Sequence, residues 1–284
     1  MFQRQLFVTA LFSGLLALLL LGCGGRSNPA AMTDGNLLLR LQANGHARVG
    51  VKLDTPPFGF PLAGQPAGFD IDVINDVLSR LRINRITYVP VTSANRMDKL
   101  LSGEVDMLIA SMTITRARDR QVDFSIPYFE DGQGLLVAAD SSIQGPADLA
   151  GRKVGATRGS TSILNLRQVA PRAELVEYAN FNALTKGLIE GEVEAISTDT
   201  TILIGLARSM PGGTQSWRLA GNPFSTEPYG IAVPKNQSDL RSAINNALME
   251  MWEDGDFQML YDTWFGPHTP FAGLVNFGIT PYPR

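Results

Sequence analysis

Stretches with the pattern of buried β-strands alternate with stretches of helical periodicity, and this alternation occurs twice along the chain. Residues 47–53 form a β-rich run, and Ile74, Val77, Leu78 and Leu81 then recur at helical spacing. Such alternation predicts parallel sheets covered by helices. The alternating part spans about 240 residues, more than one domain of typical size (~100–150 residues), so we expect two α/β lobes.

The other elements of this pattern can be placed by their apolar periodicity. We expect strands at residues 86–91, 106–110, 153–156, 175–178, 193–197 and 229–235. We expect helices at residues 95–101, from about 162, at 184–189 and around 240–251. Ligands bind such sheets at the carboxyl ends of the strands. The loops that follow the strands are therefore the candidate site, namely residues 54–60, 92–96, 111–118, 157–162 and 198–201.

Charge and composition exclude several classes of function. Among 284 residues, 24 Lys and Arg face 27 Asp and Glu, and the net charge of -3 leaves no basic surplus for nucleic acid. Two histidines and one cysteine are too few for a zinc cage or a disulfide framework. The sequence motifs of dinucleotide, phosphate, zinc and serine chemistry are absent. We therefore expect no metal, no cofactor and no nucleic-acid partner.

The first residues have the pattern of an export signal. Arg4 is the only charge before an uncharged, mostly apolar run at residues 6–22, which is shorter than the roughly 20 residues of a membrane-spanning helix. The run ends in LLGC at Cys23, which resembles the lipobox of bacterial lipoproteins, where the cysteine thiol carries diacylglycerol. We expect a signal peptide at residues 1–22, followed at 23–45 by the lipidated cysteine, a tether and a leading helix. The expected location is extracytoplasmic and lipid-anchored, with a membrane span as the alternative.

Two loops carry the charges that pair with a free α-amino acid. Its carboxylate needs hydrogen-bond donors and its ammonium needs an acid, because a buried unpaired charge costs several kcal/mol. Ser111 and Thr113 offer hydroxyls at a strand end, and Arg118 follows with a guanidinium suited to a carboxylate. Asp199, just after the strand at residues 193–197, can pair with the ammonium. The alternatives are a surface position for Arg118 and an N-cap role for Asp199.

A third polar loop, at residues 157–162, opens a predicted helix. Free backbone N–H groups at a helix start, with the hydroxyls of Ser160 and Thr161, favour an anion. The alternative is that one of these hydroxyls only caps the helix. No single loop is specific, but together the three loops match the charges of an amino acid.

Six segments, in this order, resemble one protein family. They are GFDID at residues 68–72, MTITRARDRQVDFS at 112–125, DLAGRKVGATRGSTS at 148–162, STDT at 197–200, YGIAVPK at 229–235 and WFG at 264–266. The set is similar to the extracytoplasmic polar amino-acid-binding proteins of ABC importers, solute-binding protein family 3. The similarity covers roughly residues 37–266 and is closest to the glutamate/aspartate-binding members.

The resemblance implies a periplasmic-binding-protein-like fold of type II, in which two doubly wound, mainly parallel sheets are joined by two hinge strands. It places lobe 1 at residues 46–132 and 229–266, lobe 2 at residues 133–228 and a C-terminal tail at residues 267–284. Lobes of this family close on a ligand, and the closed form docks on a membrane permease. The expected partners are an amino-acid ligand and ABC permease subunits, and the expected state is a monomer.

Carried over by position, the resemblance assigns Arg118, Thr113 and Thr161 to the α-carboxylate of the ligand. It assigns Ser111 and Asp199 to the α-ammonium. These five residues come from three loops and from both expected lobes.

Specificity for the ligand side chain is expected from another segment. TSANR, which contains Ser93 and Arg96, resembles the segment whose Ser and Arg meet the distal carboxylate in glutamate/aspartate-binding members. Lys52 lies where those proteins often place another cation, and Phe58 is expected as an apolar wall of the cleft. The expected ligand is therefore glutamate or aspartate. Phe181 stands near the position of a histidine in some acidic-residue binders, which leaves glutamine and asparagine open.

Two further alternatives stay open. For the side-chain pocket, the alternative is a solvent-facing Lys52 and an Arg96 that caps a helix. For the function, the alternative is an enzyme similar to the periplasmic cyclohexadienyl dehydratases, which requires a cleft carboxylate as general acid. Glu130 and Glu227 are the acids nearest to the expected hinges, and both are expected at the rim.

Overall fold

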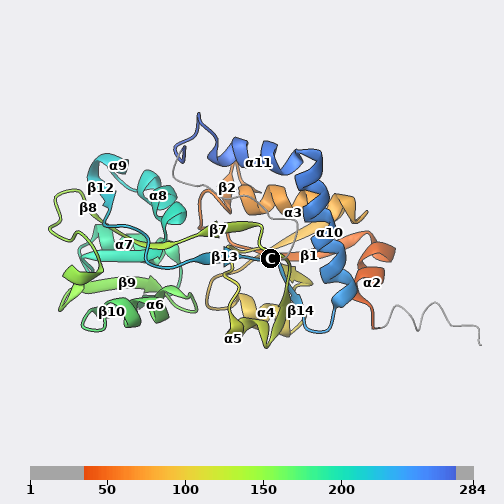
Figure 1. Cartoon of the computed structure of the whole chain (residues 1–284), viewed down its shortest axis with the longest axis horizontal. Helices are drawn as coiled ribbons and strands as arrows, with labels where there is room; N and C mark the ends of the chain where they lie inside the picture. Colours follow the sequence, from red (N-terminus) through yellow and green to blue (C-terminus); the bar gives the residue numbers. More distant parts are fainter. Residues whose placement is uncertain (1–34, 273–284) are drawn as a thin grey trace, which may run out of the picture. The chain divides into compact units, whose positions relative to one another are not determined.

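The computed structural model describes residues 35–272, which form two α/β lobes that each contain a five-stranded sheet (Figure 1). The expectations for residues 1–34 and 273–284, Cys23 included, lie outside the described residues. No helix within residues 35–272 is long and apolar enough to cross a membrane.

Lobe 1 is the lobe whose sheet has the strand order β4-β1-β5-β14-β6. Its strands are β1 (His46–Val51), β4 (Arg85–Pro90), β5 (Met107–Leu108), β6 (Val122–Phe124) and β14 (Ala232–Pro234). Its helices are α2 (Leu37–Asn44), α3 (Phe69–Arg80), α4 (Arg96–Leu101), α5 (Arg116–Asp119), α10 (Ser238–Asp254) and α11 (Asp256–Phe265). A short hairpin of β2 (Phe60–Leu62) and β3 (Gln65–Ala67) precedes α3.

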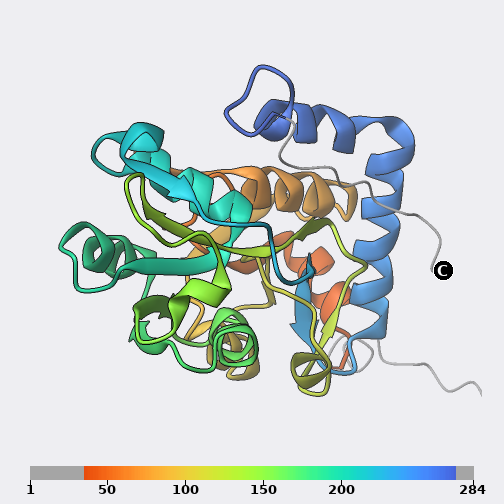
Figure 2. The same ribbon diagram turned by 60° about the vertical axis from the view of Figure 1, so that its left-hand side comes forward.

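Lobe 2 is the lobe whose sheet has the order β10-β9-β11-β8-β12. Its strands are β8 (Gln133–Ala138), β9 (Lys153–Thr157), β10 (Glu174–Tyr178), β11 (Ala195–Asp199) and β12 (Trp217–Leu219). Its helices are the 3-10 turn η1 (Pro146–Leu149), α6 (Ser162–Val169), α7 (Phe181–Ile189), α8 (Thr200–Ser209) and α9 (Gly213–Ser216). Two short strands, β7 (Phe129–Asp131) and β13 (Glu227–Tyr229), pair antiparallel and run between the lobes (Figures 1 and 2).

One strand in each sheet of the described chain runs against the other four, and this reversal decides where the loops meet. β14 pairs antiparallel with β5 and β6, and β8 pairs antiparallel with β11 and β12. Both reversed strands follow a crossing strand, so each enters its sheet from the side of the other lobe. The start of β8 at Gln133 therefore lies opposite the end of β11 at Asp199. The remaining strands end at the junction of the lobes, which is where ligands bind in α/β sheets.

The first turn of α3 shows how local sequence places a functional group. Gly68 precedes the helix with φ 133°, and a Cβ there would lie 2.1 Å from the carbonyl O of Phe58. Only glycine fits this approach without strain. The apolar face of α3, including Ile74 and Val77, is completely buried, as the helical spacing predicts. Asp70 is carried inward on the same face, where a carboxylate is rare unless it has partners.

One predicted strand is divided in two. Residues 229–235 are predicted as a single strand, but β13 ends at Tyr229 and β14 begins at Ala232. The break separates the crossing strand from the strand that joins the lobe 1 sheet. At Gly230 between them, a Cβ would lie 2.9 Å from the side chain of Ile114, so the chain passes its neighbour closely at this point.

Candidate ligand-binding site

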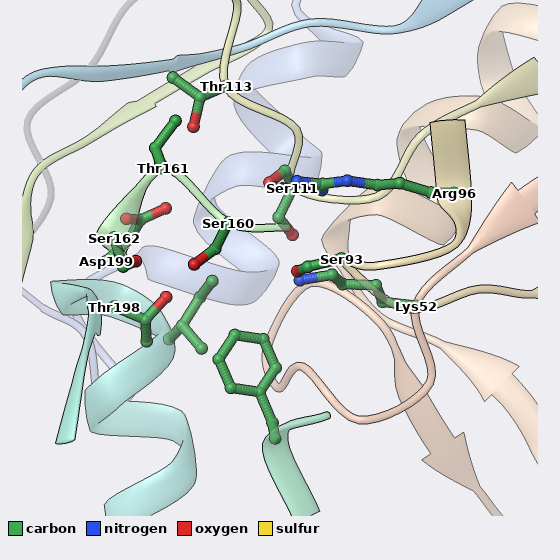
Figure 3. Close-up of a pocket in the computed structure, with 12 residues that line it drawn as sticks. Lys52, Ser93, Arg96, Ser111, Thr113, Ser160, Thr161, Ser162, Thr198 and Asp199 are labelled. Carbon is green, nitrogen blue, oxygen red and sulfur yellow. Dashed lines mark hydrogen bonds between the residues drawn. The ribbon is translucent and has the colours of Figure 1, made fainter. Parts of the chain in front are cut away.

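The loops at the strand ends line a small, polar cavity. Side chains from both lobes point toward its centre (Figure 3). The lining residues are Lys52, Ser93, Arg96, Ser111, Thr113, Ser160, Thr161, Ser162, Phe181, Thr198, Asp199 and Ile202.

Of the ten predicted binding residues, eight line this cavity: Lys52, Ser93, Arg96, Ser111, Thr113, Ser160, Thr161 and Asp199. The ninth, Arg118, lies beside it and is half-buried. Its Nη1 donates to the carbonyl O of Thr113 at 2.8 Å, and its Nη2 donates to that of Gly159 at 3.1 Å. Arg118 therefore joins a loop of lobe 1 to a loop of lobe 2.

Phe58 is not part of the cavity lining, so the expectation of an apolar wall at this position is wrong. Its ring is completely buried and packs against Phe129 and Tyr229 with centroid distances of 4.9 and 5.4 Å. The same aromatic cluster includes Phe69 and Phe265. A ring in such a cluster stabilises the core through apolar burial and edge-to-face contacts and has no surface left for a ligand.

The apolar wall comes instead from Phe181 and Ile202 in lobe 2. Phe181 begins α7, just after β10, and Ile202 lies in the first turn of α8, which follows β11 directly. Sequence reasoning also missed Ser162 and Thr198, which lie next to predicted residues. The sequence signal that could have identified these four lining residues is their position near a strand end or a helix start.

Lys52 follows the last residue of β1 and reaches the cavity, so a solvent-facing position is wrong. Its side chain is only 3% exposed, and its Nζ lies 4.5 Å from the centroid of the Phe181 ring, a cation–π geometry. Burial and the neighbouring positive charge of Arg96 together lower the pKa of Lys52 to about 7. A nearby anion would reverse this shift because it stabilises the ammonium.

Arg96 is the first residue of α4, yet its side chain does not cap the helix. It is 2% exposed, and its Nη1 donates to the carbonyl O of Ala110 at 2.7 Å, while its Nε is buried without a hydrogen-bond partner. Burial lowers the pKa of Arg96 to about 9, so the guanidinium stays charged at neutral pH. Within residues 35–272, no carboxylate forms an ion pair with Lys52 or Arg96.

Asp199 supplies the acid of the cavity lining. It stands at the N-cap position of α8, but its side chain makes no capping hydrogen bond and accepts one from the Tyr229 hydroxyl instead. Burial, together with the negative charges of Asp131 and Glu227, raises the pKa of Asp199 to about 8. An ammonium group beside Asp199 would favour the ionised form.

A second buried acid, Asp70, holds the loop that carries Ser111. Its carboxylate accepts the Ser111 backbone N–H at 2.8 Å, the Ser111 hydroxyl at 3.2 Å and the Tyr128 hydroxyl at 2.8 Å. Burial raises the pKa of Asp70 to about 6, although these three donors lower it in part. Ser111 has a positive φ of 44°, a conformation that is strained for a serine. The anchor on Asp70 keeps the loop in this conformation.

Glu227 is buried, so its expected place at the rim is wrong, whereas Glu130 is exposed as expected. Glu227 does not line the cavity. Its carboxylate accepts hydrogen bonds from Thr161 Oγ1 at 2.9 Å, Asn165 Nδ2 at 2.7 Å and Ser225 Oγ at 2.7 Å. The Thr161 hydroxyl proton therefore points to the crossing strand, and Thr161 offers the cavity lone pairs and its backbone N–H rather than an O–H donor.

Residues 47–267 match the family model of the bacterial extracellular solute-binding proteins, family 3. The chain belongs to this family. The two-lobe α/β fold is thereby confirmed, and the extracellular family agrees with the expected extracytoplasmic location.

Relatives of this family 3 protein cover most of its length. The ABC transporter glutamine-binding protein GlnH of Bacillus subtilis is 38% identical over 92% of this chain and 97% of its own. The glutamate-binding protein GluB of Corynebacterium efficiens is 33% identical over 79% of this chain and 80% of its own. Among solved structures, an ancestral arginine-binding protein bound to glutamine has a TM-score of 0.74 and 39% identity, over 78% of this chain and 98% of that one.

Proposed function

We propose that this protein binds L-glutamate between its two lobes and delivers it to the permease of an ABC amino-acid importer. The observation that supports this proposal is the charge of the cavity lining. The lining holds two buried cations, Lys52 and Arg96, and one acid, Asp199. A zwitterion without a charged side chain, with its α-carboxylate on Arg118 and its α-ammonium on Asp199, leaves both cations without a counter-charge. Glutamate brings one further negative charge to Lys52 and Arg96, and buried charges are stable only when they are paired.

The α-groups of the ligand are held as in the assignment from the family resemblance, except that Thr161 contributes its backbone N–H rather than its hydroxyl, which donates to Glu227. Arg118, Thr113 and the backbone N–H groups at the start of α6 receive the α-carboxylate, while Asp199 and Ser111 receive the α-ammonium. Ser160, at the start of α6, donates its hydroxyl to the carbonyl O of Thr157 at 2.7 Å. Its backbone N–H is already donated to the same carbonyl. Ser160 therefore shapes this loop, and the remaining free N–H groups face the anion.

The distal carboxylate is received by Lys52, Ser93 and Arg96 of lobe 1. Hydrogen bonds to charged groups contribute about 1.5–3 kcal/mol each. Micromolar affinity needs about 8 kcal/mol in total, so a few such bonds above the cost of ordering the ligand are sufficient.

Glutamine is the second candidate, and three observations favour it. The Bacillus subtilis relative at 38% identity carries the name of a glutamine-binding protein, and the ancestral structure at 39% identity holds glutamine. In addition, the lowered pKa of Lys52, about 7, allows a neutral amine beside a neutral amide. Aspartate and asparagine are shorter by one methylene and leave the cations farther from a partner.

Ligand binding is coupled to movement of the lobes in this proposal. The moving units are residues 46–132 with 229–266 and residues 133–228, connected near β7 and β13. A ligand that contacts both lobes binds the closed state more tightly, and this difference shifts the population toward closure.

The membrane anchor is proposed to be a lipid on Cys23, which follows the predicted signal peptide. Replacing Cys23 with Ser is expected to release the protein from the membrane fraction or leave it unprocessed. Labelling with a radioactive fatty acid checks this. Persistent label in the variant would contradict the lipoprotein proposal.

The ligand is tested by calorimetric titration with glutamate, glutamine, aspartate, asparagine, arginine and histidine. The protein is first unfolded and refolded so that carried-over ligand is removed. Tight binding of glutamate with at least about hundredfold discrimination against glutamine supports the acidic pocket, at tenfold per 1.4 kcal/mol. Preference for glutamine or a basic amino acid would contradict the assignment of glutamate as the ligand. Binding of none of the six amino acids would contradict the proposed function.

A further inference from the structure

Gly205 brings the two lobes into direct backbone contact on one side of the cavity. It lies within α8 of lobe 2, one helical turn after the cavity-lining Ile202. A Cβ at this position would lie 2.1 Å from the carbonyl O and 2.6 Å from the carbonyl C of Pro56, in the loop after β1 of lobe 1. Backbone atoms cannot move aside as a flexible side chain can, so any residue other than glycine pushes the lobes apart.

Gly159 makes the corresponding contact in the loop before α6. A Cβ there would lie 2.5 Å from the carbonyl O of Ser93 and 2.9 Å from Ala94 Cα, both in lobe 1. The Gly159 carbonyl also accepts the hydrogen bond from Arg118 Nη2. Ser93 lines the cavity, so this contact forms its edge directly beside the ligand space.

Local backbone structure does not explain a glycine at position 205. The residue lies inside a helix and is not among the residues with positive φ. Glycine in a helix interior is less stable than alanine there. The close approach of Pro56 is the feature that excludes a side chain.

We propose that Gly205, together with Gly159, is a closure contact, at which the absence of a side chain lets lobe 2 reach lobe 1 in the closed, ligand-holding state. This inference rests on the proposed function, because it concerns how the same cavity retains its ligand. A side chain at position 205 acts as a wedge. It leaves each lobe intact and lowers the fraction of molecules that can close, which raises the apparent Kd by the same factor.

The test compares Gly205→Ala and Gly205→Leu with the unchanged protein. Gly205→Ala is expected to weaken the affinity for the preferred amino acid about tenfold, and Gly205→Leu about a hundredfold or more. Without ligand, the unfolding midpoint of Gly205→Ala is expected to stay the same or rise by about 2 °C, because alanine favours the helix. An unchanged or raised unfolding midpoint combined with weaker ligand binding is a pair of results that a merely structural glycine does not produce.

Gly145→Ala is the matched control, because Gly145 has an extended φ of 175° and a Cβ there meets nothing within 4 Å. Its affinity is expected to equal that of the unchanged protein. Gly159→Ala is less informative because Gly159 has a positive φ of 76°, which adds backbone strain to the clash.

Affinities are measured by calorimetry with glutamate and glutamine, and compaction on ligand addition is measured by solution X-ray scattering. The expected result for Gly205→Leu is a radius of gyration that ligand no longer reduces. Wild-type affinity and compaction in both Gly205 variants would overturn the inference while leaving the proposed function intact. An unchanged protein that binds no amino acid would overturn the proposed function, and the inference would fall with it.

Discussion

The two lobes contribute different chemistry to the same cavity. Lobe 1 brings the cations, with Lys52 and Arg96 in the lining and Arg118 beside it. Both lobes bring hydroxyl groups, whereas the acid Asp199 and the apolar wall of Phe181 come from lobe 2. The cations are held from within lobe 1, because Arg96 donates to a carbonyl of its own lobe.

This difference indicates a division of labour. A lobe whose cations are already positioned and unpaired can select a ligand by charge before the other lobe arrives. Lobe 2, with its apolar wall and Asp199, adds short-range contacts that form only on closure. Substitutions in lobe 1 should therefore change which ligand is bound, whereas those at contacts between the lobes should change how tightly any ligand is held.

The largest effect is expected for Arg118→Met. The change removes the guanidinium proposed for the α-carboxylate and the bond to the Gly159 carbonyl, so two or more charge-assisted hydrogen bonds are lost. Affinity for every amino acid should fall about a thousandfold, as measured by calorimetry. Arg120→Met, at an exposed arginine two residues later, is the control. Near-normal affinity in Arg118→Met would show that other residues bind the α-carboxylate.

Arg96→Met separates selection by charge from binding in general. It keeps most of the side-chain volume and removes the buried guanidinium, so glutamate affinity should fall about a hundredfold while glutamine affinity changes less than about fivefold. Competition of glutamate and of glutamine against a labelled amino acid gives the ratio of the two affinities directly. Arg116→Met, on the exposed side of α5, should leave the ratio unchanged. Equal losses of affinity for glutamate and glutamine would contradict the proposed pocket for an acidic side chain.

The pH dependence of binding compares one group from each lobe. A ligand carboxylate favours protonated Lys52, whose pKa is about 7, so this group weakens glutamate binding as the pH rises above 7. A ligand ammonium favours ionised Asp199, whose pKa is about 8, so that group strengthens binding as the pH rises toward 8. Each effect reaches at most tenfold per pH unit.

Lys52→Met removes the first of these effects and keeps the second. In this variant, glutamate affinity should increase steadily between pH 6 and pH 8, whereas in the unchanged protein it should vary less because the two groups act in opposite directions. Titrations at several pH values measure both profiles. Lys153→Met, at an exposed lysine of β9, should keep the original profile. Identical profiles in Lys52→Met and the unchanged protein would contradict the role of Lys52.

A smaller effect is expected at the rim of the cavity. The carboxylate of Asp54, in lobe 1, accepts the Phe181 backbone N–H of lobe 2 at 2.9 Å. Asp54→Ala should lower the affinity for every ligand about fivefold, since one partly exposed hydrogen bond between the lobes contributes about 1 kcal/mol. The expected change lies in the dissociation rate, which stopped-flow fluorescence can follow. Asp140→Ala, at an exposed aspartate of lobe 2, serves as the comparison.

Much of the fold follows from local periodicity. The helical spacing of apolar residues predicts α3 and α10, and the alternation of elements predicts the parallel strands, because these patterns need only burial of one face. The break between β13 and β14 is not readable in this way. Residues 229–235 have one β-rich composition, and only the pairing of Tyr229 with β7 and of Ala232 with β5 divides them.

The site shows the same limit. Residues at strand ends were predictable as a group, because all strands that run in one direction end on one side of a sheet. Phe58 and Phe181 were not distinguishable, since both are phenylalanines in loops or helix starts near the cleft. Packing decides between them: one ring lies in an aromatic cluster, and the other faces Lys52.

The sequence by itself determined that this chain forms two α/β lobes and which loops carry hydroxyls, cations and acids, because both depend on residue type and short-range spacing. The tertiary structure alone decided that Lys52 and Arg96 are buried without carboxylate partners among residues 35–272, that Glu227 holds Thr161, and that Gly205 meets Pro56. The physical reason is that burial, charge pairing and steric fit arise between residues far apart in the chain. Such contacts leave no mark on local sequence patterns.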